Sequence, residues 1–246
     1  MKRGGIDIGS RFVKYAVING SGAMSFYKKE TGHNPLSVCR QLINSDKPDI
    51  LTATGYGRCL MEVSDDTQTI TEIKAVARGA KEVFPSCRTV IDIGGQDTKV
   101  ISLRAEGGVG AFEMNDRCAA GTGRFMEIMA KVLGYSISNF GMDSRSDNAH
   151  SISINSMCTV FAESEVITLI NKGVEREHIA RSVHMSVAQK VIAMAKRIEV
   201  NEAIVFAGGC ANNRTLVGIL EAYFQKPVFI HESSEMLAAL GAALYE

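Results

Sequence analysis

Residues 5–18 read GIDIGSRFVKYAVI, and residues 90–103 read VIDIGGQDTKVISL. Three residue types recur in both stretches at one constant offset: Asp7 with Asp92, Gly9 with Gly94, and Lys14 with Lys99. Each stretch is a short apolar run, a turn of small or polar residues, and a second run of β-forming residues. This pattern predicts a β-hairpin whose turn carries Asp-x-Gly. The repeat therefore predicts two equivalent hairpins in one chain.

The residue types of these turns suit phosphate chemistry. A glycine turn leaves backbone N–H groups without side-chain cover, so a phosphate chain can lie against them. A carboxylate beside the turn can hold Mg²⁺, usually through water. A single Asp-x-Gly is equally well explained as a tight turn, but two copies in matching context favour a nucleoside triphosphate held from both sides. The chain has no G-x-x-x-x-G-K-[ST] sequence, so a Walker-type P-loop is excluded.

Composition excludes several classes of protein. The chain has 246 residues, with 27 Lys+Arg against 27 Asp+Glu and no Trp, which argues against a nucleic-acid partner. No run approaches the roughly 18 apolar residues of a membrane span, and Asp7 interrupts any apolar signal segment. Six scattered cysteines without a CxxC pair do not form a secreted disulfide framework. We therefore expect a cytoplasmic protein with no nucleic-acid and no membrane partner.

The order of the predicted elements indicates an α/β fold in two lobes. The first lobe, residues 1–85, is expected to hold strands near 4–18, 22–28 and 50–54 and helices after Pro35 and over 72–83. The second lobe, residues 86–233, is expected to hold strands near 89–104 and 202–207 and helices over 123–133 and 179–198. A helix over 234–246 is expected to pack back on the first lobe. Its small residues permit a close helix crossing.

Two of the cysteines precede helical patterns. Cys118 lies in EMNDRCAAGTGRF (113–125), and Cys158 lies in NSMCTVFAESEV (155–166). A helix N-terminus stabilises a thiolate and would favour an anionic iron–sulfur cluster. Two cysteines cannot complete a 4Fe–4S cluster, but a twofold homodimer would supply two more. A small, inert, half-buried side chain is the alternative for any single cysteine, and it is the interpretation for Cys39, Cys59, Cys87 and Cys210.

The motifs resemble a known family. The paired hairpins are similar to those of the sugar kinase/Hsp70/actin superfamily of ATPases, and AIVFAGGCANN (203–213) looks like its adenosine-binding element. A closer resemblance, running from residue 4 to the C-terminus, is to the activator ATPases of the 2-hydroxyacyl-CoA dehydratases. That family includes the ATP-binding subunits of benzoyl-CoA reductases. The stretches that carry the resemblance are TGYGR (54–58), VIDIGGQDTKV (90–100), MNDRCAAGTGRF (114–125), SMCTVFAESEV (156–166) and AGGCANN (207–213).

The resemblance implies a two-lobed actin-like fold with a nucleotide cleft between the lobes. It also implies one 4Fe–4S cluster, held by Cys118 and Cys158 across a homodimer. ATP binding and hydrolysis with Mg²⁺ would drive an electron, received from a ferredoxin- or flavodoxin-type donor, into an acceptor metalloenzyme. The setting would be anaerobic and the acceptor most often a 2-hydroxyacyl-CoA dehydratase.

The family's site residues carry over by position. The first phosphate hairpin would be Asp7, Gly9, Ser10 and Lys14, and the second Asp92, Gly94, Gly95, Gln96 and Asp97. Gly121 and Gly123 would border the nucleotide, and Gly208, Gly209 and Asn213 the adenosine. Asp7 and Asp92 are the Mg²⁺ candidates, and Glu72 or Gln96 would position the attacking water.

The sequence departs from the family pattern at two places. Arg11 stands where a small residue is usual, and it either points to solvent or adds a phosphate contact. Lys74, Ala75 and Val76 stand where many members carry Thr-Cys-His. These departures indicate a divergent subgroup, so the acceptor could instead be a double-cubane-cluster protein or a benzoyl-CoA reductase. A small-molecule kinase or an ATP-dependent regulator on the same fold remains an alternative.

Overall fold

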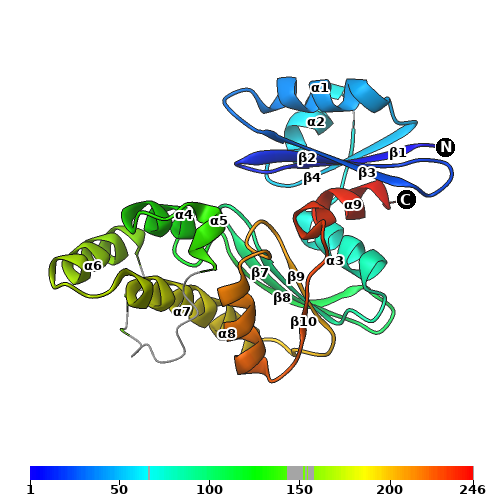
Figure 1. The fold of residues 1–246 in the computed structure, drawn as a ribbon. Helices are drawn as coiled ribbons and strands as arrows, with labels where there is room; N and C mark the ends of the chain where they lie inside the picture. Colours follow the sequence, from blue (N-terminus) through cyan, green and yellow to red (C-terminus); the bar gives the residue numbers. More distant parts are fainter. Residues whose placement is uncertain (66, 143–151, 153, 155–157, 246) are drawn as a thin grey trace.

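Two five-stranded mixed sheets form the frame of the protein (Figure 1). The computed structural model describes residues 1–65, 67–142, 152, 154 and 158–245. The first half contains β1 (Arg3–Ile8), β2 (Phe12–Ile18), β3 (Met24–Glu30), α1 (Pro35–Asp46), β4 (Ile50–Thr54), α2 (Arg58–Asp65), β5 (Gln68–Thr69) and α3 (Glu72–Val83).

The second half begins with β6 (Thr89–Ile93), β7 (Thr98–Leu103), β8 (Val109–Asn115), α4 (Gly123–Val132) and α5 (Ile137–Phe140). It continues with α6 (Thr159–Asn171), α7 (Arg176–Ala195), β9 (Ile204–Ala207), α8 (Arg214–Phe224) and β10 (Val228–Phe229). A 3₁₀ turn (Ser234–Met236) and α9 (Leu237–Ala243) follow.

The repeat seen in the sequence extends to whole sheets. The first sheet has the order β3-β2-β1-β4-β5, and the second has the equivalent order β8-β7-β6-β9-β10. In each sheet an antiparallel hairpin (β1–β2 or β6–β7) is joined by a parallel fourth strand (β4 or β9). Asp7 pairs with Lys14 in the first hairpin, and Asp92 pairs with Lys99 in the second. Both predicted hairpins are therefore confirmed.

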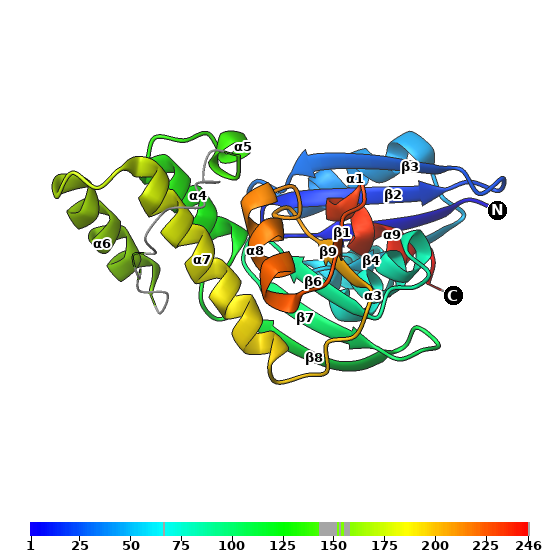
Figure 2. The ribbon, with the colours of Figure 1, turned by 60° about the horizontal axis from the view of Figure 1, so that its bottom comes forward.

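The two sheets are covered differently. The first sheet carries α1 between β3 and β4, whereas the second carries α4 to α7 between β8 and β9. In Figures 1 and 2, α6 lies at the end of the molecule farthest from β1–β3, beside α4 and α7. The apolar faces of α4, α7 and α8 cover one face of the second sheet in a large core that includes Phe125, Met129, Val187 and Leu216. The helices that follow the two candidate cysteines therefore belong to the second half.

Two helices join the sheets through a backbone contact. α9 packs on β1, β2 and β4, and α3 contacts β6 to β9, while α3 and α9 cross each other between the sheets (Figure 1). At the crossing, a Cβ on Gly241 would overlap the carbonyl oxygen of Ala75, and a Cβ on Gly79 would overlap that of Leu237. The small residues of the C-terminal segment thus permit the close crossing that was expected. The division of the chain at residue 85 stays a prediction.

Several short elements were not predicted. These are α2, which buries only Met61, the four-residue helix α5, the two-residue strands β5 and β10, and β8, whose side chains are mostly outside the core. Each of them is short or mostly exposed, so few buried apolar residues mark it in the sequence. The expected helix over 179–198 is α7, shifted to 176–195, and the expected helix over 234–246 is a 3₁₀ turn followed by a shorter α9. Among the described residues, no helix combines the length and the apolar character needed to cross a bilayer.

The helix crossing predicts a large stability difference between two Gly→Ala variants. Gly241→Ala should lower the free energy of unfolding by about 3 kcal/mol or prevent folding, because its methyl group meets backbone that moves only if α3 and α9 separate. Gly218→Ala on the exposed face of α8 meets no atom within 4 Å and should raise the free energy of unfolding by roughly 0.5–1 kcal/mol. Urea unfolding followed by circular dichroism measures both. Equal stability of Gly241→Ala and wild type would contradict the crossing.

Candidate functional site

The turns of the two hairpins have the same backbone geometry and face each other. The Gly9 N–H donates to the Phe12 carbonyl at 3.1 Å, and the Gly94 N–H donates to the Asp97 carbonyl at 2.9 Å. A Cβ on Gly95 would lie 3.6 Å from Ser10 Oγ of the other hairpin. The structure therefore brings the two predicted phosphate hairpins together, with their glycine turns opposed.

Two lysines bind the carboxylates of the hairpins: Lys14 is half-buried, and Lys99 is fully buried. Lys14 Nζ lies 3.2 Å from Asp7 Oδ2. Lys99 Nζ, whose side chain is 1% exposed, lies 2.7 Å from Asp97 Oδ2, 2.9 Å from Glu72 Oε1 and 3.5 Å from Asp92 Oδ2. Glu72 is the first residue of α3, so this helix reaches from the sheet junction into the site.

The charges of this cluster are coupled. Burial lowers the pKa of Lys99, but Asp92, Glu72 and Asp97 outweigh it, so the pKa of Lys99 is raised and the ammonium stays charged. The pKa of Lys14 is also raised, because Asp7 and Asp92 outweigh the effect of burial.

Two of the carboxyl groups hold protons more tightly than usual. Burial raises the pKa of Asp92, with Lys99 acting against it. Burial likewise raises the pKa of Glu72 to about 7 against the attraction of Lys99. Four carboxyl groups thus face two ammonium groups, which favours a cation at this site.

One carboxylate oxygen is available to a ligand. Asp7 Oδ1 is buried and has no hydrogen-bond partner among the described residues. A buried polar atom without a partner is uncommon in folded proteins and is typical of a site that binds an ion or water. The donor set of Asp7 and Asp92 therefore fits a hard cation such as Mg²⁺.

Two glycines that follow the parallel strands β4 and β9 lie directly against the two aspartates. Gly55 follows β4 with φ +86°, and Gly208 follows β9 with φ +84°. A Cβ on Gly55 would overlap Asp7 Oδ1, and a Cβ on Gly208 would overlap Asp92 Oδ1. Only glycine suits both the backbone conformation and the space. Gly208 is a predicted site residue, whereas Gly55 was missed, although the repeat makes TGYGR the equivalent of AGGCANN.

Of the residues predicted to border the adenosine, Gly209 faces open space, whereas Asn213 is hydrogen-bonded within the protein. A Cβ on Gly209 would meet no atom within 4 Å, so the loop is open there. Asn213 caps α8, since its Oδ1 accepts the Leu216 N–H at 3.0 Å, and its Nδ2 lies 3.0 Å from His184 Nε2. Burial lowers the pKa of His184 to about 4, so the ring is neutral and its Nε2 accepts from Asn213. The side chain of Asn213 is thus occupied within the protein, and its contact with adenosine stays a prediction.

The start of α4 is hydrogen-bonded to the second hairpin. The Gly123 N–H donates to the Gly94 carbonyl at 2.8 Å, and the Arg124 N–H donates to the Gly95 carbonyl at 2.9 Å. Gly123 is needed for this contact, because its Cβ would lie 2.8 Å from the same Gly94 oxygen. Gly121 precedes the helix with φ +91° and packs on the Lys190 side chain. Gln96 is exposed at the tip of the hairpin.

Arg11 was expected to point to solvent or to contact phosphate, but its partner in the structure is a carboxylate. Its guanidinium forms an ion pair with Glu127 of α4. Glu127 also pairs with Arg124 at 3.3 Å. Arg11 therefore links the first hairpin to the helix that docks on the second hairpin. Its side chain is still 46% exposed, and a contact between Arg11 and phosphate stays a prediction.

The two candidate cysteines have different local settings. Cys158 is the N-cap residue of α6, as expected. Cys118 is not at a helix N-terminus, because α4 begins only at Gly123 after an intervening turn, so the predicted stabilisation by a helix dipole is wrong for this cysteine. Both are partly exposed, and α4 packs against α6.

The other cysteines have different surroundings, and the described residues offer no ready-made metal site. Cys39 and Cys87 are buried, and burial raises the pKa of each thiol to about 11. Burial raises the pKa of Cys210 to about 12, whereas Cys59 is exposed. In the part of the chain that the structure describes, no group of three or more His, Cys, Asp or Glu side chains is arranged to hold a metal ion.

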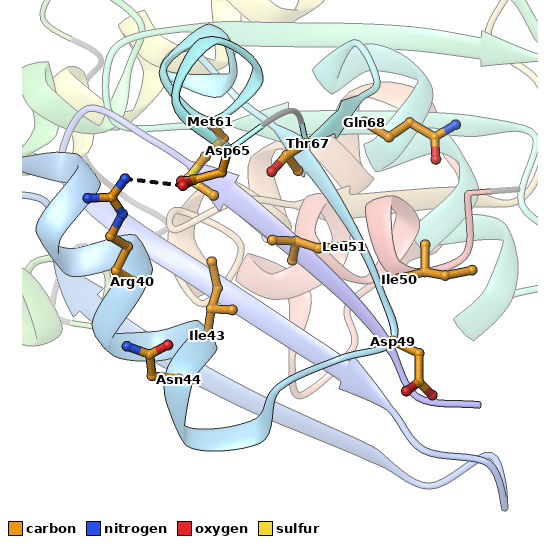
Figure 3. A pocket seen from close by; sticks show the side chains of 10 residues that line it. All are labelled: Arg40, Ile43, Asn44, Asp49, Ile50, Leu51, Met61, Asp65, Thr67 and Gln68. Atoms are coloured by element: carbon orange, nitrogen blue, oxygen red, sulfur yellow. Dashed lines mark hydrogen bonds and ion pairs between the residues drawn. The ribbon is translucent and has the colours of Figure 1, made fainter.

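A separate cavity lies on the first sheet, away from the hairpins. It has a volume of about 580 Å³ and is bounded by α1, β4, α2 and β5 (Figure 3). Ile43, Leu51 and Met61 line it, and an Arg40–Asp65 ion pair of 3.1 Å stands at its side. None of the predicted site residues lines this cavity.

Comparison with known proteins agrees with this geometry. The model of the BadF/BadG/BcrA/BcrD ATPase family matches residues 5–245. The chain is 38% identical over 250 residues to the 2-hydroxyisocaproyl-CoA dehydratase activator of Clostridioides difficile, covering 98% of this chain and 93% of the relative. It is 28% identical over 263 residues to a benzoyl-CoA reductase subunit of Thauera aromatica, covering 98% of this chain and 91% of that relative.

Solved structures extend the comparison to the fold. The activator of the 2-hydroxyisocaproyl-CoA dehydratase from Clostridium difficile, solved with bound ADPNP, matches with a TM-score of 0.88 at 37% identity, covering 100% of this chain and 94% of that one. MreB 5 of Spiroplasma citri matches with a TM-score of 0.59 at 14% identity, covering 100% and 96%, and shows the fold alone. The predicted α/β, two-lobed actin-like ATPase fold is confirmed. With the family model matched over nearly its whole length, this chain belongs to the BadF/BadG/BcrA/BcrD ATPase family.

Proposed function

We propose that the protein is a homodimeric iron–sulfur ATPase that couples ATP binding and hydrolysis to low-potential electron transfer into a partner enzyme. A 2-hydroxyacyl-CoA dehydratase is the first candidate for that partner, because the C. difficile relative is an activator of such an enzyme. The observation that carries the proposal is the docking of α4 on Gly94 and Gly95. A phosphate hairpin and the Cys118 segment are thereby parts of one hydrogen-bonded unit.

Nucleotide binding follows from the opposed hairpins. The backbone N–H groups of the Gly9–Ser10 and Gly94–Gly95 turns would hold the phosphates. Asp7 and Asp92 would hold Mg²⁺, which keeps several waters and takes its remaining ligands from the phosphates. The open backbone at Gly208–Gly209 would receive the adenosine. The ADPNP of the similar activator supports this arrangement.

The cluster proposal rests on Cys118 and Cys158. Four thiolates hold a 4Fe–4S cluster, so two cysteines from each of two copies would complete the set. α6, which Cys158 caps, carries the apolar side chains Val160 and Phe161, each 66% exposed. An exposed apolar surface of this kind is typical of an interface. When bound, the cluster would supply the electron that passes to the acceptor.

The departures from the family pattern on α3 have an explanation in helix packing as well as in the choice of acceptor enzyme. Ala75 and Val76 are buried on α3, and Ala75 lies directly under Gly241 of α9. The small residue at position 75 therefore fits the helix crossing. An acceptor such as a benzoyl-CoA reductase or a double-cubane-cluster protein remains the alternative, and the similarity to the T. aromatica relative favours its inclusion. A small-molecule kinase or a regulator would contain no iron.

Iron analysis tests the function directly. Anaerobically purified wild type should contain about four iron and four sulfide per dimer, and Cys118→Ala or Cys158→Ala should each lose them, because the set of four thiolates is broken. Cys59→Ala is the matched control, since this exposed cysteine is not a proposed ligand and its variant should keep the full content. Iron-free wild type after anaerobic reconstitution would overturn the redox function and leave a kinase or a regulator.

Glu72 and Gln96 are the two candidates for positioning the attacking water. We favour Glu72, because a carboxyl group with a pKa of about 7 can accept a proton near neutral pH. Glu72→Gln should lower the rate of ATP hydrolysis by about a hundredfold while the affinity for a non-hydrolysable ATP analogue stays within a few-fold. Gln96→Ala should hydrolyse ATP at a rate close to wild type. The reverse order of the two rates would assign the role to Gln96.

The raised pKa of Glu72 also predicts a pH dependence of stability. The folded protein holds this proton up to about pH 7, whereas the unfolded chain releases it near 4.5. The free energy of unfolding should therefore fall as pH rises between those values. Because a quarter of the Glu72 side chain is exposed, the fall relative to Glu72→Gln should be on the order of 1–2 kcal/mol between pH 5 and 7.5. Parallel pH curves for the two proteins in urea unfolding would contradict a titration of Glu72 in this range.

A further inference from the structure

The loop that carries Cys118 is held by its carbonyl groups. Asn115 Nδ2 donates to the Cys118 carbonyl at 3.0 Å and to the Ala120 carbonyl at 3.1 Å. Thr122 Oγ1 donates to the Ala119 carbonyl at 2.6 Å. Thr98 Oγ1 donates to the Gly121 carbonyl at 2.7 Å. Each of four successive carbonyl groups, from residue 118 to residue 121, thus accepts a hydrogen bond from a side chain.

Two of these donors come from the sheet and not from the loop. Thr98 is the first residue of β7 and Asn115 the last of β8, and the two are directly paired across the strands. Thr98 is completely buried. Its neighbour Asp97 belongs to the second phosphate hairpin and binds Lys99. The Thr98–Asn115 pair, hereafter the carbonyl clamp, therefore connects the hairpin to the cysteine loop along the end of the sheet.

The clamp is separate from the docking of α4. The α4 contacts fix the segment that follows the loop, through Gly123 and Arg124. The clamp fixes the loop itself, residues 118–121, to the ends of β7 and β8. Since the carbonyl of Gly121 lies against a buried hydroxyl, removal of that hydroxyl would leave it without this donor, and the loop would gain freedom to open.

We propose that Thr98 and Asn115 are positioning residues that hold Cys118 in place and transmit the position of the second phosphate hairpin to it. This inference rests on the proposed function, because it concerns a cysteine assigned there as a cluster ligand. The clamp makes its hydrogen bonds to the backbone carbonyls of the cysteine loop. It acts only through the backbone of residues 118–121.

The reactivity of Cys118 in metal-free protein tests the clamp without any measurement of activity. Each cysteine is alkylated with N-ethylmaleimide at fixed pH, and its rate is followed by peptide mass spectrometry. Thr98→Val, which removes the hydroxyl and keeps the shape, should raise the rate at Cys118 about fivefold, and Asn115→Ala should act in the same direction. Cys158 serves as the internal control and should keep its wild-type rate in both variants.

Thr89→Val is the matched control. Thr89 is also a completely buried strand threonine that donates to a backbone carbonyl, that of Asn201, at 2.8 Å. It begins β6, away from the cysteine loop. Its variant should leave the rate at Cys118 unchanged. A rate in Thr98→Val equal to that in Thr89→Val would overturn the clamp, and so would an equal rise at Cys158, which indicates general loosening.

Transmission is tested in the same assay with ADP or a non-hydrolysable ATP analogue. In wild type the two nucleotides should give different rates at Cys118, and in Thr98→Val the difference should disappear. A difference that survives in Thr98→Val, or that is absent in wild type with nucleotide bound, would overturn transmission. The iron content of wild type is measured separately. A lack of iron would therefore count against the proposed function, whereas the alkylation rates judge the clamp.

Discussion

The backbone contact between α3 and α9 is the constraint on which the rest of the molecule depends. Each helix is packed on a different sheet, and the two cross at Gly79 and Gly241 with no room for a side chain. The same α3 begins with Glu72, which reaches Lys99 in the site. The element that joins the sheets therefore also contributes a carboxylate between the hairpins. A change in the crossing would move Glu72 relative to the second hairpin.

The site is built twice from one local plan. In each sheet an aspartate at the end of the first strand faces a lysine across the hairpin, and a glycine with positive φ closes on that aspartate from the neighbouring parallel strand. The burial of these carboxylates is tolerated because the lysines remain charged beside them. The second copy adds Asp97 and Glu72 around its lysine, so the two halves differ in charge. This asymmetry leaves a surplus of carboxylates where Mg²⁺ and phosphates would bind.

The second half carries the larger insertion between its strands, and this insertion contains α4 and both candidate cysteines. α4 follows the Cys118 loop and docks on the second hairpin, while Arg11 of the first hairpin pairs with Glu127 of α4. Both hairpins therefore contact the same helix. A relative movement of the hairpins would act on α4 from two sides, which is the arrangement that coupling between nucleotide and cysteine loop requires.

The sequence by itself determined the two hairpins and the α/β class, because strand pairing through a short turn depends on neighbouring residues. It also determined the family, through motifs that stay together along the chain. Only the tertiary structure decided the partners of Lys99 and Arg11 and the close approach of Gly55 to Asp7. These depend on how residues distant in the chain pack across the sheets, and no local pattern of residues records such contacts.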